Sequence, residues 1–340
     1  MLNLAITGFG RIGRITLRTI RKNYVKKARV VAINTSGSMD AAGWAHLFKY
    51  DSVYGTWPED ILVLPPKQSA EIGRIKIGKD QYPVLAQKDP AKIAWRDYKV
   101  DTVLECTGAF LNKKAENHFL GGAKKVVLSA PPKDSSIPTF VLGVNDKQYQ
   151  KQKLVSNASC TTNCVAPIVK VIDQAIGFQE ALMTTIHAYT ASQQVVDGSD
   201  KDLRRARAAA VNLVPTGTGA AKSVEAVYPE IAGRFAATAI RAPIICGSYS
   251  TFIFKTNRAT SVDEVNQILE SQAAKKLAGI LAISYDPLVS SDIVGISASA
   301  VVDAASTKVV SDDLLYLSAW YDNEWAYSCR LAELAIKIGR

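Results

Sequence analysis

Hydrophobic and polar positions divide the chain into two halves of different character. At the N-terminus, an apolar run at 2–7 ends at a glycine, residues 11–23 carry apolar side chains at helical spacing, and 29–34 is a second apolar run. A strand, a helix and a strand within about 30 residues are typical of a βαβ unit. Further strand-like runs follow at 102–106, 125–129 and 139–142. The first half therefore predicts a Rossmann-type, doubly wound parallel sheet of the α/β class.

The second half follows a different pattern. Residues 235–241 and 248–255 alternate like antiparallel strands, whereas 190–220 is polar, basic and loop-like. Other strands are predicted at 181–187, 296–301 and 314–320, and helices at 164–176, 261–278 and 324–338. This half therefore predicts an α+β domain with a mostly antiparallel sheet.

A glycine pattern joins the first predicted strand to the first predicted helix. Gly8, Gly10 and Gly13 stand where a dinucleotide-binding loop needs a tight turn, room for a pyrophosphate and close packing of helix on strand. The pattern alone is weak, and a tight turn that binds nothing is the alternative. Its place between a strand and a helix, with a second strand at the right distance, favours the dinucleotide.

The end of the second strand indicates which nicotinamide cofactor is used. An acid that binds ribose hydroxyls is usual there, but this chain reads Asn34-Thr35-Ser36, and no carboxylate follows until Asp40. A carboxylate would repel a 2′-phosphate, whereas hydroxyl groups would bind one. Thr35 and Ser36 therefore predict that NADP is accepted, either beside NAD or in preference to it.

Residues 156–163 read Ser-Asn-Ala-Ser-Cys-Thr-Thr-Asn and hold one cysteine among small, uncharged polar side chains. With a helix predicted directly afterwards, Cys160 would face free backbone N–H groups and the positive end of the helix dipole, both of which lower the pKa of a thiol. The alternative, a buried and unreactive cysteine, suits Cys164 better. We therefore expect Cys160 to be a nucleophile, and together with the glycine loop it suggests oxidation of an aldehyde through a thioester.

A histidine and two arginines are candidates for the same site. His187 ends a predicted strand and is well placed to act as a base on the cysteine, although a structural histidine fits that position equally well. Arg205 and Arg241 are candidate phosphate clamps, because a planar guanidinium binds phosphate through two hydrogen bonds. The other basic residues of 201–207 are typical of a solvated surface.

Composition narrows the remaining classes of function. The net charge of +10 favours phosphorylated metabolites over nucleic acid, because the basic segment lacks the interleaved aromatic residues of RNA-binding surfaces. Five scattered cysteines without a CxxC pair predict no metal site and a reducing, cytoplasmic location. Since no apolar run reaches about 18 residues, we expect no membrane span.

From end to end, the chain resembles phosphorylating glyceraldehyde-3-phosphate dehydrogenases. Besides the octet, the matching stretches are Gly-Phe-Gly-Arg-Ile-Gly-Arg (8–14), His-Leu-Phe-Lys-Tyr-Asp-Ser-Val-Tyr-Gly (46–55), Glu-Cys-Thr-Gly (105–108), Gly-Gly-Ala-Lys-Lys-Val (121–126), Thr-Gly-Ala-Ala-Lys (218–222) and Trp-Tyr-Asp-Asn-Glu-Trp (320–325). The octet and the Trp-Tyr-Asp-Asn-Glu run are together highly specific. The resemblance implies reversible oxidation of D-glyceraldehyde 3-phosphate, with inorganic phosphate and NAD or NADP, to 1,3-bisphosphoglycerate.

The resemblance also implies a role for each matching residue. Cys160 attacks the aldehyde, and His187 is the base. The attacking-phosphate site would contain Ser159, Thr161, Thr218 and Gly219. The substrate-phosphate site would contain Thr190 and Arg241, with Arg205 between the two sites. The cofactor contacts would be Gly8, Gly10, Arg11, Ile12, Gly13, Thr35, Ser36, Thr107, Ser129, Ser199 and Asn323, the last orienting the nicotinamide amide.

At the level of domains, the family implies a cofactor domain of residues 1–159 with 323–340 and a catalytic domain of 160–322. It also implies a homotetramer, in which a loop near 190–214 reaches the cofactor site of a neighbouring subunit. Gly198-Ser199 stands in this loop where many NAD-specific members have Leu-Pro, and a serine there resembles photosynthetic members that use NADP.

Three positions depart from the family pattern. Thr35 replaces the usual acid, Ala326 replaces the glycine that usually precedes Tyr327, and Ala-Pro-Ile-Ile-Cys (242–246) replaces a run of the Val-Pro-Thr-Pro-Asn type. The last departure leaves the local structure around Arg241 open, whereas the assignment of Arg241 itself as a site residue is unaffected.

Other functions are weighed against the main one. Erythrose-4-phosphate dehydrogenase shares the nucleophile and the base, but the stretch Lys-Tyr-Asp-Ser (49–52) favours the triose enzyme. A non-phosphorylating aldehyde dehydrogenase is disfavoured, because it would not need the candidate phosphate-binding arginines. A nucleic-acid-binding protein or a catalytically inactive interaction protein would not need the full set of site residues.

Overall fold

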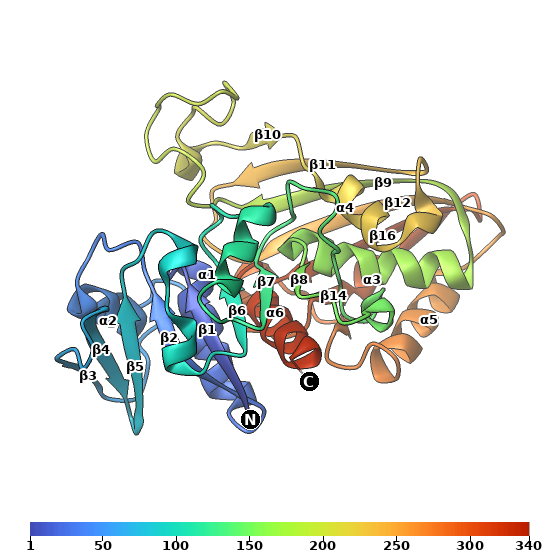
Figure 1. The fold of residues 1–340 in the computed structure, drawn as a ribbon. Coiled ribbons are helices and arrows are strands. Elements are labelled where there is room, and N and C mark those ends of the chain that lie inside the picture. Colours follow the sequence, from blue (N-terminus) through green and yellow to red (C-terminus); the bar gives the residue numbers. More distant parts are fainter. Residues whose placement is uncertain (340) are drawn as a thin grey trace. The chain divides into compact units, whose positions relative to one another are not determined.

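The computed structural model describes residues 1–339, and the chain forms two compact units (Figure 1). The first unit consists of Met1–Phe140, Gln148–Ala158 and Ser328–Arg340, and the second of Val141–Lys147 and Ser159–Tyr327. Within the described residues, no helix is both long enough and apolar enough to cross a membrane.

The first unit is built on an eight-stranded sheet in the order β3-β4-β5-β2-β1-β6-β7-β8. The strands are β1 (Leu2–Thr7), β2 (Ala28–Asn34), β3 (Ile61–Leu64), β4 (Glu71–Ile77), β5 (Asp80–Leu85), β6 (Thr102–Glu105), β7 (Lys125–Leu128) and β8 (Leu154–Ser156). From β5 to β8 all neighbours run parallel, whereas β3, β4 and β5 pair antiparallel at one edge. The predicted Rossmann-type sheet is confirmed.

Helices of the first unit bury apolar faces against this sheet. Helix α1 (Arg11–Thr19) continues as a π-helical turn at Ile20–Tyr24, and α2 (Ala41–Lys49) follows β2. The C-terminal helix α6 (Trp325–Ile338) begins in the second unit and ends in the first. Its predicted apolar face is buried: Leu331, Leu334, Ala335 and Ile338 are all 0% exposed.

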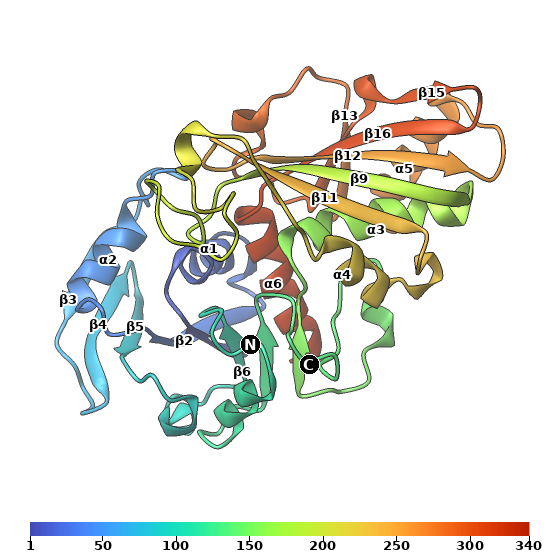
Figure 2. The same cartoon turned by 90° about the horizontal axis from the view of Figure 1, so that it is seen from above.

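The second unit has a mixed sheet in the order β10-β11-β9-β12-β16-β14-β13, with β15 paired to β16. Its strands are β9 (Phe178–Ala188), β10 (Val214–Thr216), β11 (Phe235–Ala242), β12 (Ser248–Thr256), β13 (Leu281–Ser284), β14 (Ala300–Asp303), β15 (Lys308–Val310) and β16 (Leu314–Tyr321). Most pairings are antiparallel, as predicted. Helices α3 (Cys160–Ala175), α4 (Ala220–Val227) and α5 (Val262–Ala274) cover one face of the sheet (Figure 2).

One predicted strand is wrong, a second begins later than predicted, and a third pairs in an unexpected direction. Residues 139–142 form only an isolated bridge between Thr139 and Ser156, because the chain leaves the first unit there. The strand predicted at 296–301 begins only at Ala300. Strand β11 alternates like an antiparallel strand, yet it pairs parallel with β9 and antiparallel only with the short β10. Alternation reports which face is buried, not the direction of the neighbouring strand.

Candidate active site

Cys160 is the first residue of helix α3, whereas the sequence predicts that this helix begins at 164. Ser159 caps the helix, because its Oγ accepts a hydrogen bond from the backbone N–H of Thr162 at 3.0 Å. The first turn consists of small polar residues, so the apolar periodicity that signals a helix starts one turn later. Ala158, directly before the cap, has a φ of 56°, which turns the chain sharply into the helix.

Strand pairing brings three of the predicted site residues together in the second unit. In the parallel register of β11 and β9, Arg241 lies beside His187. The Nε2 atom of His187 lies 3.4 Å from the Sγ atom of Cys160, and Arg241 Nη1 lies 2.6 Å from His187 Nδ1. A thiol, an imidazole and a guanidinium therefore form one cluster, although they are 27 and 54 residues apart along the chain.

Burial keeps both members of the Cys–His pair neutral. Desolvation raises the pKa of the Cys160 thiol, although the charge of Arg241 and a hydrogen bond with Thr161 act in the opposite direction. Desolvation and the charge of Arg241 lower the pKa of His187 to about 3. The expectation of a lowered thiol pKa is therefore wrong for the free protein.

Nδ1 of His187 has two close polar neighbours. The carbonyl oxygen of Ala188 lies 2.6 Å away and can only accept, whereas Nη1 of Arg241 lies 2.6 Å away and can only donate. Arg241 Nη1 also donates to the carbonyl of Ala188 at 3.1 Å. In the tautomer with the proton on Nδ1, which then donates to Ala188, the lone pair of Nε2 faces Cys160.

A network of hydroxyl groups that the sequence analysis missed surrounds the pair. Tyr321 is 1% exposed, and its hydroxyl lies 3.0 Å from Thr161 Oγ1 and 2.8 Å from Thr185 Oγ1. Its ring stands edge-on to the ring of His187, with centroids 5.9 Å apart. Tyr321 lies in the Trp-Tyr-Asp-Asn-Glu stretch, so its motif was recognised but its contact with the site was not.

The remaining phosphate-site candidates lie on loops of the same unit. Arg205 donates from Nε to Thr216 Oγ1 at 2.7 Å. Burial lowers the pKa of Arg241, and the charge of Arg205 acts in the same direction. Thr190 Oγ1 lies 2.9 Å from Ser192 Oγ. Thr218 accepts the backbone N–H of Ala220 at 3.1 Å, and Gly219 is the N-cap of α4. Arg205 also lies 3.7 Å from Asp202, whereas Arg241 contacts His187 and the carbonyl oxygen of Ala188.

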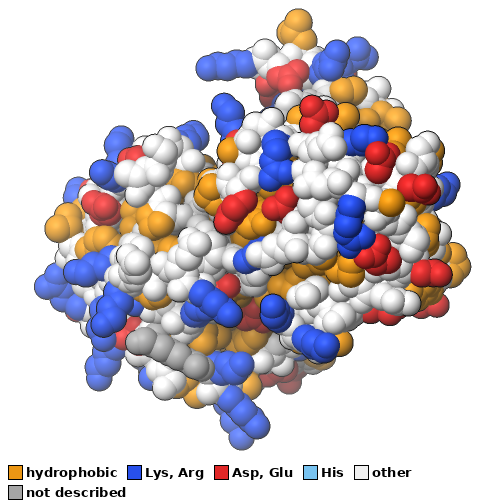
Figure 3. All heavy atoms as spheres, turned by 90° about the vertical axis from the view of Figure 1, so that its right-hand side faces the viewer, with side chains coloured by type: hydrophobic (Ala, Val, Ile, Leu, Met, Phe, Trp, Pro, Cys, Tyr) orange, Lys and Arg blue, Asp and Glu red, His pale blue; other side chains and the backbone are white. Residues whose placement is uncertain are grey.

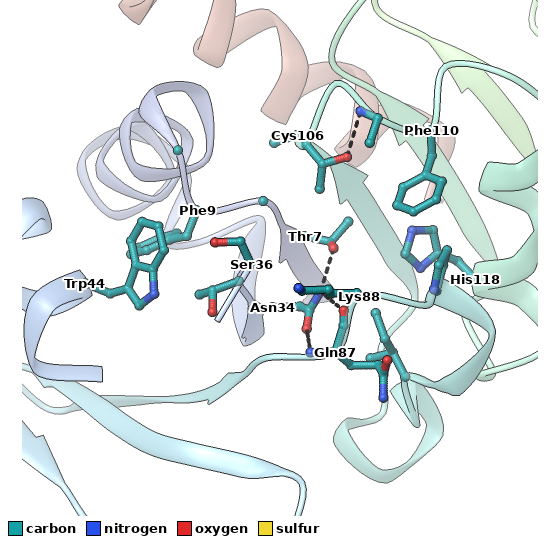
Figure 4. A pocket seen from close by; sticks show the side chains of 17 residues that line it. Thr7, Phe9, Asn34, Ser36, Trp44, Gln87, Lys88, Cys106, Phe110 and His118 are labelled. Atoms are coloured by element: carbon teal, nitrogen blue, oxygen red, sulfur yellow. Dashed lines mark hydrogen bonds between the residues drawn. The ribbon is translucent and has the colours of Figure 1, made fainter. Parts of the chain in front are cut away.

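The glycine loop borders a cavity of about 430 Å³ in the first unit (Figure 4). A Cβ atom on Gly8, which has a φ of 90°, would lie 2.6 Å from the backbone of Cys106, and one on Gly13 would lie 2.1 Å from the carbonyl oxygen of Gly8. Gly10, by contrast, faces open space. The turn and the helix packing therefore require glycine, and the middle position leaves room for a ligand at the N-terminus of α1.

No carboxylate lines this cavity, and Lys88 is the one lysine or arginine that does. Thr35 and Ser36 both line it. Thr35 is 2% exposed, and its hydroxyl donates to the carbonyl oxygen of Leu85 at 3.0 Å, so it is not a free donor. Ser36 is exposed and pairs with Ser38 at 2.9 Å. Of the two predicted hydroxyl donors, only Ser36 is presented to a ligand.

The floor of the cavity holds a buried polar chain. Trp95 Nε1 can only donate, so Nδ1 of His118, 3.0 Å away, accepts, and its Nε2–H faces Glu105 at 3.1 Å. The other oxygen of Glu105 accepts the backbone N–H of Thr107 at 2.7 Å. His118 and Glu105 thus fix Thr107, a predicted cofactor contact on the cavity wall.

The other predicted cofactor contacts lie in separate places. Arg11 and Ile12 form the first turn of α1, where backbone N–H groups have no helical partner, and Arg11 pairs with Asp51 at 2.6 Å. Ser129 follows β7, and its backbone N–H donates to Glu105. Asn323 and Ser199 belong to the second unit, Asn323 buried at 6% exposure and Ser199 on the exposed loop.

Among residues 1–339, no group of three or more His, Cys, Asp or Glu side chains could hold a metal ion. All five cysteines are free thiols.

Comparisons with known proteins match both units to one family. Residues 2–113 match the model of the NAD-binding domain of glyceraldehyde 3-phosphate dehydrogenase, and residues 159–323 match the model of its C-terminal domain. Glyceraldehyde-3-phosphate dehydrogenase 2 of Streptomyces arenae is 45% identical over 341 residues, covering 99% of this chain and 98% of the relative. Glyceraldehyde-3-phosphate dehydrogenase 1 of Bacillus cereus is 44% identical over 338 residues, covering 98% of each. The chloroplastic glyceraldehyde-3-phosphate dehydrogenase A of Chlamydomonas reinhardtii is 42% identical over 336 residues, covering 98% of this chain and 88% of the relative.

Alkylation tests the Cys–His pair in the free protein. We expect iodoacetamide to label Cys160 before the buried Cys164, Cys246 and Cys329 because Cys160 is partly exposed, and before the partly exposed Cys106 because Cys160 has a base at 3.4 Å. His187→Asn should move the pH midpoint of labelling upward, because the thiol loses its proton acceptor. Peptide mapping by mass spectrometry measures both effects, and first labelling at Cys164 or Cys246 would contradict the assignment.

Proposed function

The chain belongs to the glyceraldehyde-3-phosphate dehydrogenase family, and on that premise we propose how its residues carry out the phosphorylating oxidation of D-glyceraldehyde 3-phosphate. The observation that carries the proposal is the contact of 3.4 Å between Cys160 and a neutral His187. An imidazole with a free Nε2 lone pair can accept a proton from the thiol and return it to the substrate.

In the first half of the reaction, Sγ of Cys160 attacks the aldehyde carbon as its proton moves to Nε2 of His187. The imidazolium then protonates the aldehyde oxygen, which gives a thiohemiacetal. His187 next accepts the hydroxyl proton while hydride leaves the same carbon, so the carbon is oxidised to a thioester. The nicotinamide cofactor, when bound, supplies the hydride acceptor.

In the second half, inorganic phosphate attacks the thioester carbon. The C–S bond breaks, an acyl phosphate forms, and the sulfur regains a proton through His187. Arg241 and Thr190 are proposed to bind the phosphate that the substrate already carries. Ser159, Thr161, Thr218 and Gly219 are proposed to bind the attacking phosphate, with Arg205 between the two. Arg241 supports this assignment, because its charge acts on the Cys160 thiol and is itself opposed by the charge of Arg205, so that a bound anion would stabilise both guanidinium groups.

The cofactor is proposed to lie along the cavity of the first unit, on Gly8, Gly10, Gly13 and the first turn of α1. Two observations support acceptance of NADP. No carboxylate lines the cavity, and Lys88 and the exposed Ser36 stand on its wall. A 2′-phosphate would meet a cation and a hydroxyl group there instead of a repelling charge. In Figure 4, Ser36 and Lys88 both lie on the side of the cavity where β2 ends at Asn34.

A homotetramer is proposed from the surface of the second unit. The loop at 190–214 exposes large apolar side chains, which a monomer would leave in water: Val195, Val196, Leu203, Val211 and Leu213 are between 69% and 85% exposed. Figure 3 shows hydrophobic and charged side chains side by side on its projecting upper part. Ser199 of this loop is proposed to approach the cofactor of a neighbouring subunit, and the location is proposed to be cytoplasmic.

Activity measurements test the proposed roles of the nucleophile and the base. We expect wild type to reduce the cofactor with D-glyceraldehyde 3-phosphate only when phosphate or arsenate is present. Cys160→Ser should abolish activity, because a serine hydroxyl is far less ionised than a thiol. His187→Asn should lower the rate by roughly a hundredfold or more. Faster turnover of D-erythrose 4-phosphate would contradict the substrate assignment.

Kinetics of an arginine variant test the substrate-phosphate clamp. Arg241→Ala should raise the KM for the triose phosphate and lower kcat, because losing charge-assisted hydrogen bonds costs about 1.5–3 kcal/mol. The matched control is Arg258→Ala, which removes an arginine whose side chain is 47% exposed and pairs with Glu264. Equal kinetics of the two variants would place the clamp elsewhere.

The ratio of catalytic efficiencies with NADP and NAD tests the cofactor proposal. Thr35→Asp should shift the ratio toward NAD, because a carboxylate at the end of β2 would repel the 2′-phosphate. Thr35→Ser is the matched control, since it keeps the hydroxyl and adds no charge. A wild-type efficiency with NADP about a thousandfold below that with NAD, a gap of roughly 4 kcal/mol, would overturn the proposal.

A further inference from the structure

One serine connects the strand of the catalytic histidine with the asparagine proposed to orient the nicotinamide. Ser248, the first residue of β12, is fully buried. Its Oγ accepts the backbone N–H of Ala188, the residue after His187, at 3.1 Å. The same Oγ donates to Oδ1 of Asn323 at 3.0 Å. Within the second unit, a single hydroxyl group therefore connects the backbone beside His187 with the side chain of Asn323.

The numbers of hydrogen-bond donors and acceptors at this contact fix the orientation of the Asn323 side-chain amide. A serine hydroxyl has one proton, and Ser248 already uses a lone pair to accept from Ala188. Its proton therefore needs an acceptor, and Oδ1 of Asn323 provides it. Rotating the amide by 180° would leave the buried O–H group without an acceptor, which costs free energy. Nδ2 of Asn323 is turned away from Ser248 and makes no hydrogen bond to any residue between 1 and 339, so both of its protons are available to a ligand.

The backbone beside Asn323 is held by a second contact from the same turn. Cys246 Sγ donates to Oδ1 of Asp322 at 3.3 Å. Asp322 also accepts the backbone N–H groups of Trp325 and Gly295, both at 2.7 Å. Cys246 is one of the positions where the chain departs from the family pattern. The turn at 246–248 thus anchors residues 322 and 323 from two neighbouring points.

We propose that Ser248 is a positioning residue for the cofactor. It holds the amide of Asn323 in the one orientation in which Nδ2 donates to the oxygen of the nicotinamide carboxamide. Hydride can reach either face of a nicotinamide ring, and a fixed carboxamide fixes which face is presented to the substrate carbon. This inference rests on the proposed function through the role of Asn323.

The chain contains a matched control for the test. Ser250 lies on the same strand two residues further on, is equally buried, and its Oγ has no hydrogen-bond partner. Ser248→Ala and Ser250→Ala therefore remove the same atom from the same environment, but only the first breaks a contact to Asn323. In the full chain we expect Ser248→Ala to raise the Kd for NAD about three- to tenfold, measured by calorimetry, while Ser250→Ala stays within about twofold of wild type.

The stereochemistry of hydride transfer is the second measurement. With NAD deuterated at C4 and D-glyceraldehyde 3-phosphate, proton NMR of the reduced cofactor reports which face received the hydride. Ser248→Ala should give a measurable fraction of the opposite epimer, whereas wild type and Ser250→Ala should not. A loss of general stability would lower Tm without mixing the two faces, so this readout separates positioning from folding.

Two further variants keep the proposal testable if Ser248→Ala folds poorly. Ser248→Cys keeps a weak donor of similar size and should give a smaller loss of affinity. In an Asn323→Ala background, Ser248→Cys should cause no further change in Kd, because the contact is already absent. Equal Kd and equal stereochemistry for Ser248→Ala and Ser250→Ala would overturn the inference. A wild type that fails to oxidise the triose phosphate would instead overturn the proposed function.

Discussion

The parallel pairing of β11 with β9 is the constraint on which the catalytic half of the molecule depends. Its register sets Arg241 beside His187, and the carbonyl of Ala188 in β9 accepts from Arg241 and lies 2.6 Å from Nδ1 of His187. On the other edge of β9, antiparallel β12 brings in Ser248, which binds the next backbone N–H. A one-residue slip of either strand would turn these side chains to the opposite face of the sheet. The position of the base is therefore a property of the whole sheet.

The sequence was sufficient for the parts of the fold that rest on apolar periodicity. The βαβ unit at the N-terminus and the apolar face of α6 lie where their patterns predict them, because burial of those faces decides the local structure. The helix that carries Cys160 was placed one turn too late, since its first turn is polar and is formed by the cap of Ser159. Direction of pairing could not be derived for β11, because it depends on where a distant strand lies.

The site was predictable only as far as its residues are chemically distinctive. Cys160, His187 and Arg241 attract attention as a nucleophile, a base and a cation, and the structure places them in one cluster. Ser248, Thr185 and Tyr321 look like ordinary strand residues, and only the packed sheet reveals their hydrogen bonds. The direction of the Cys160 pKa was also out of reach, because desolvation depends on neighbours from several elements. The direction of the Thr35 hydroxyl could not be predicted from the sequence either, since it donates to the carbonyl oxygen of Leu85 and not into the cavity.

The hydrogen-bonded hydroxyl groups at Tyr321 allow the dipole beside the site to change without any movement of heavy atoms. Thr161, Tyr321 and Thr185 are linked by two hydrogen bonds, and in each bond either oxygen can be the donor. Their protons can therefore all rotate one way or the other, which reverses the dipole of the chain. Thr161 Oγ1 lies 4.0 Å from Sγ of Cys160, so the end of this chain adjoins the atom whose charge changes during the reaction. A rigid, buried site can in this way follow a thiol, a thiolate and a thioester in turn, because its polarisation resides in proton orientation alone.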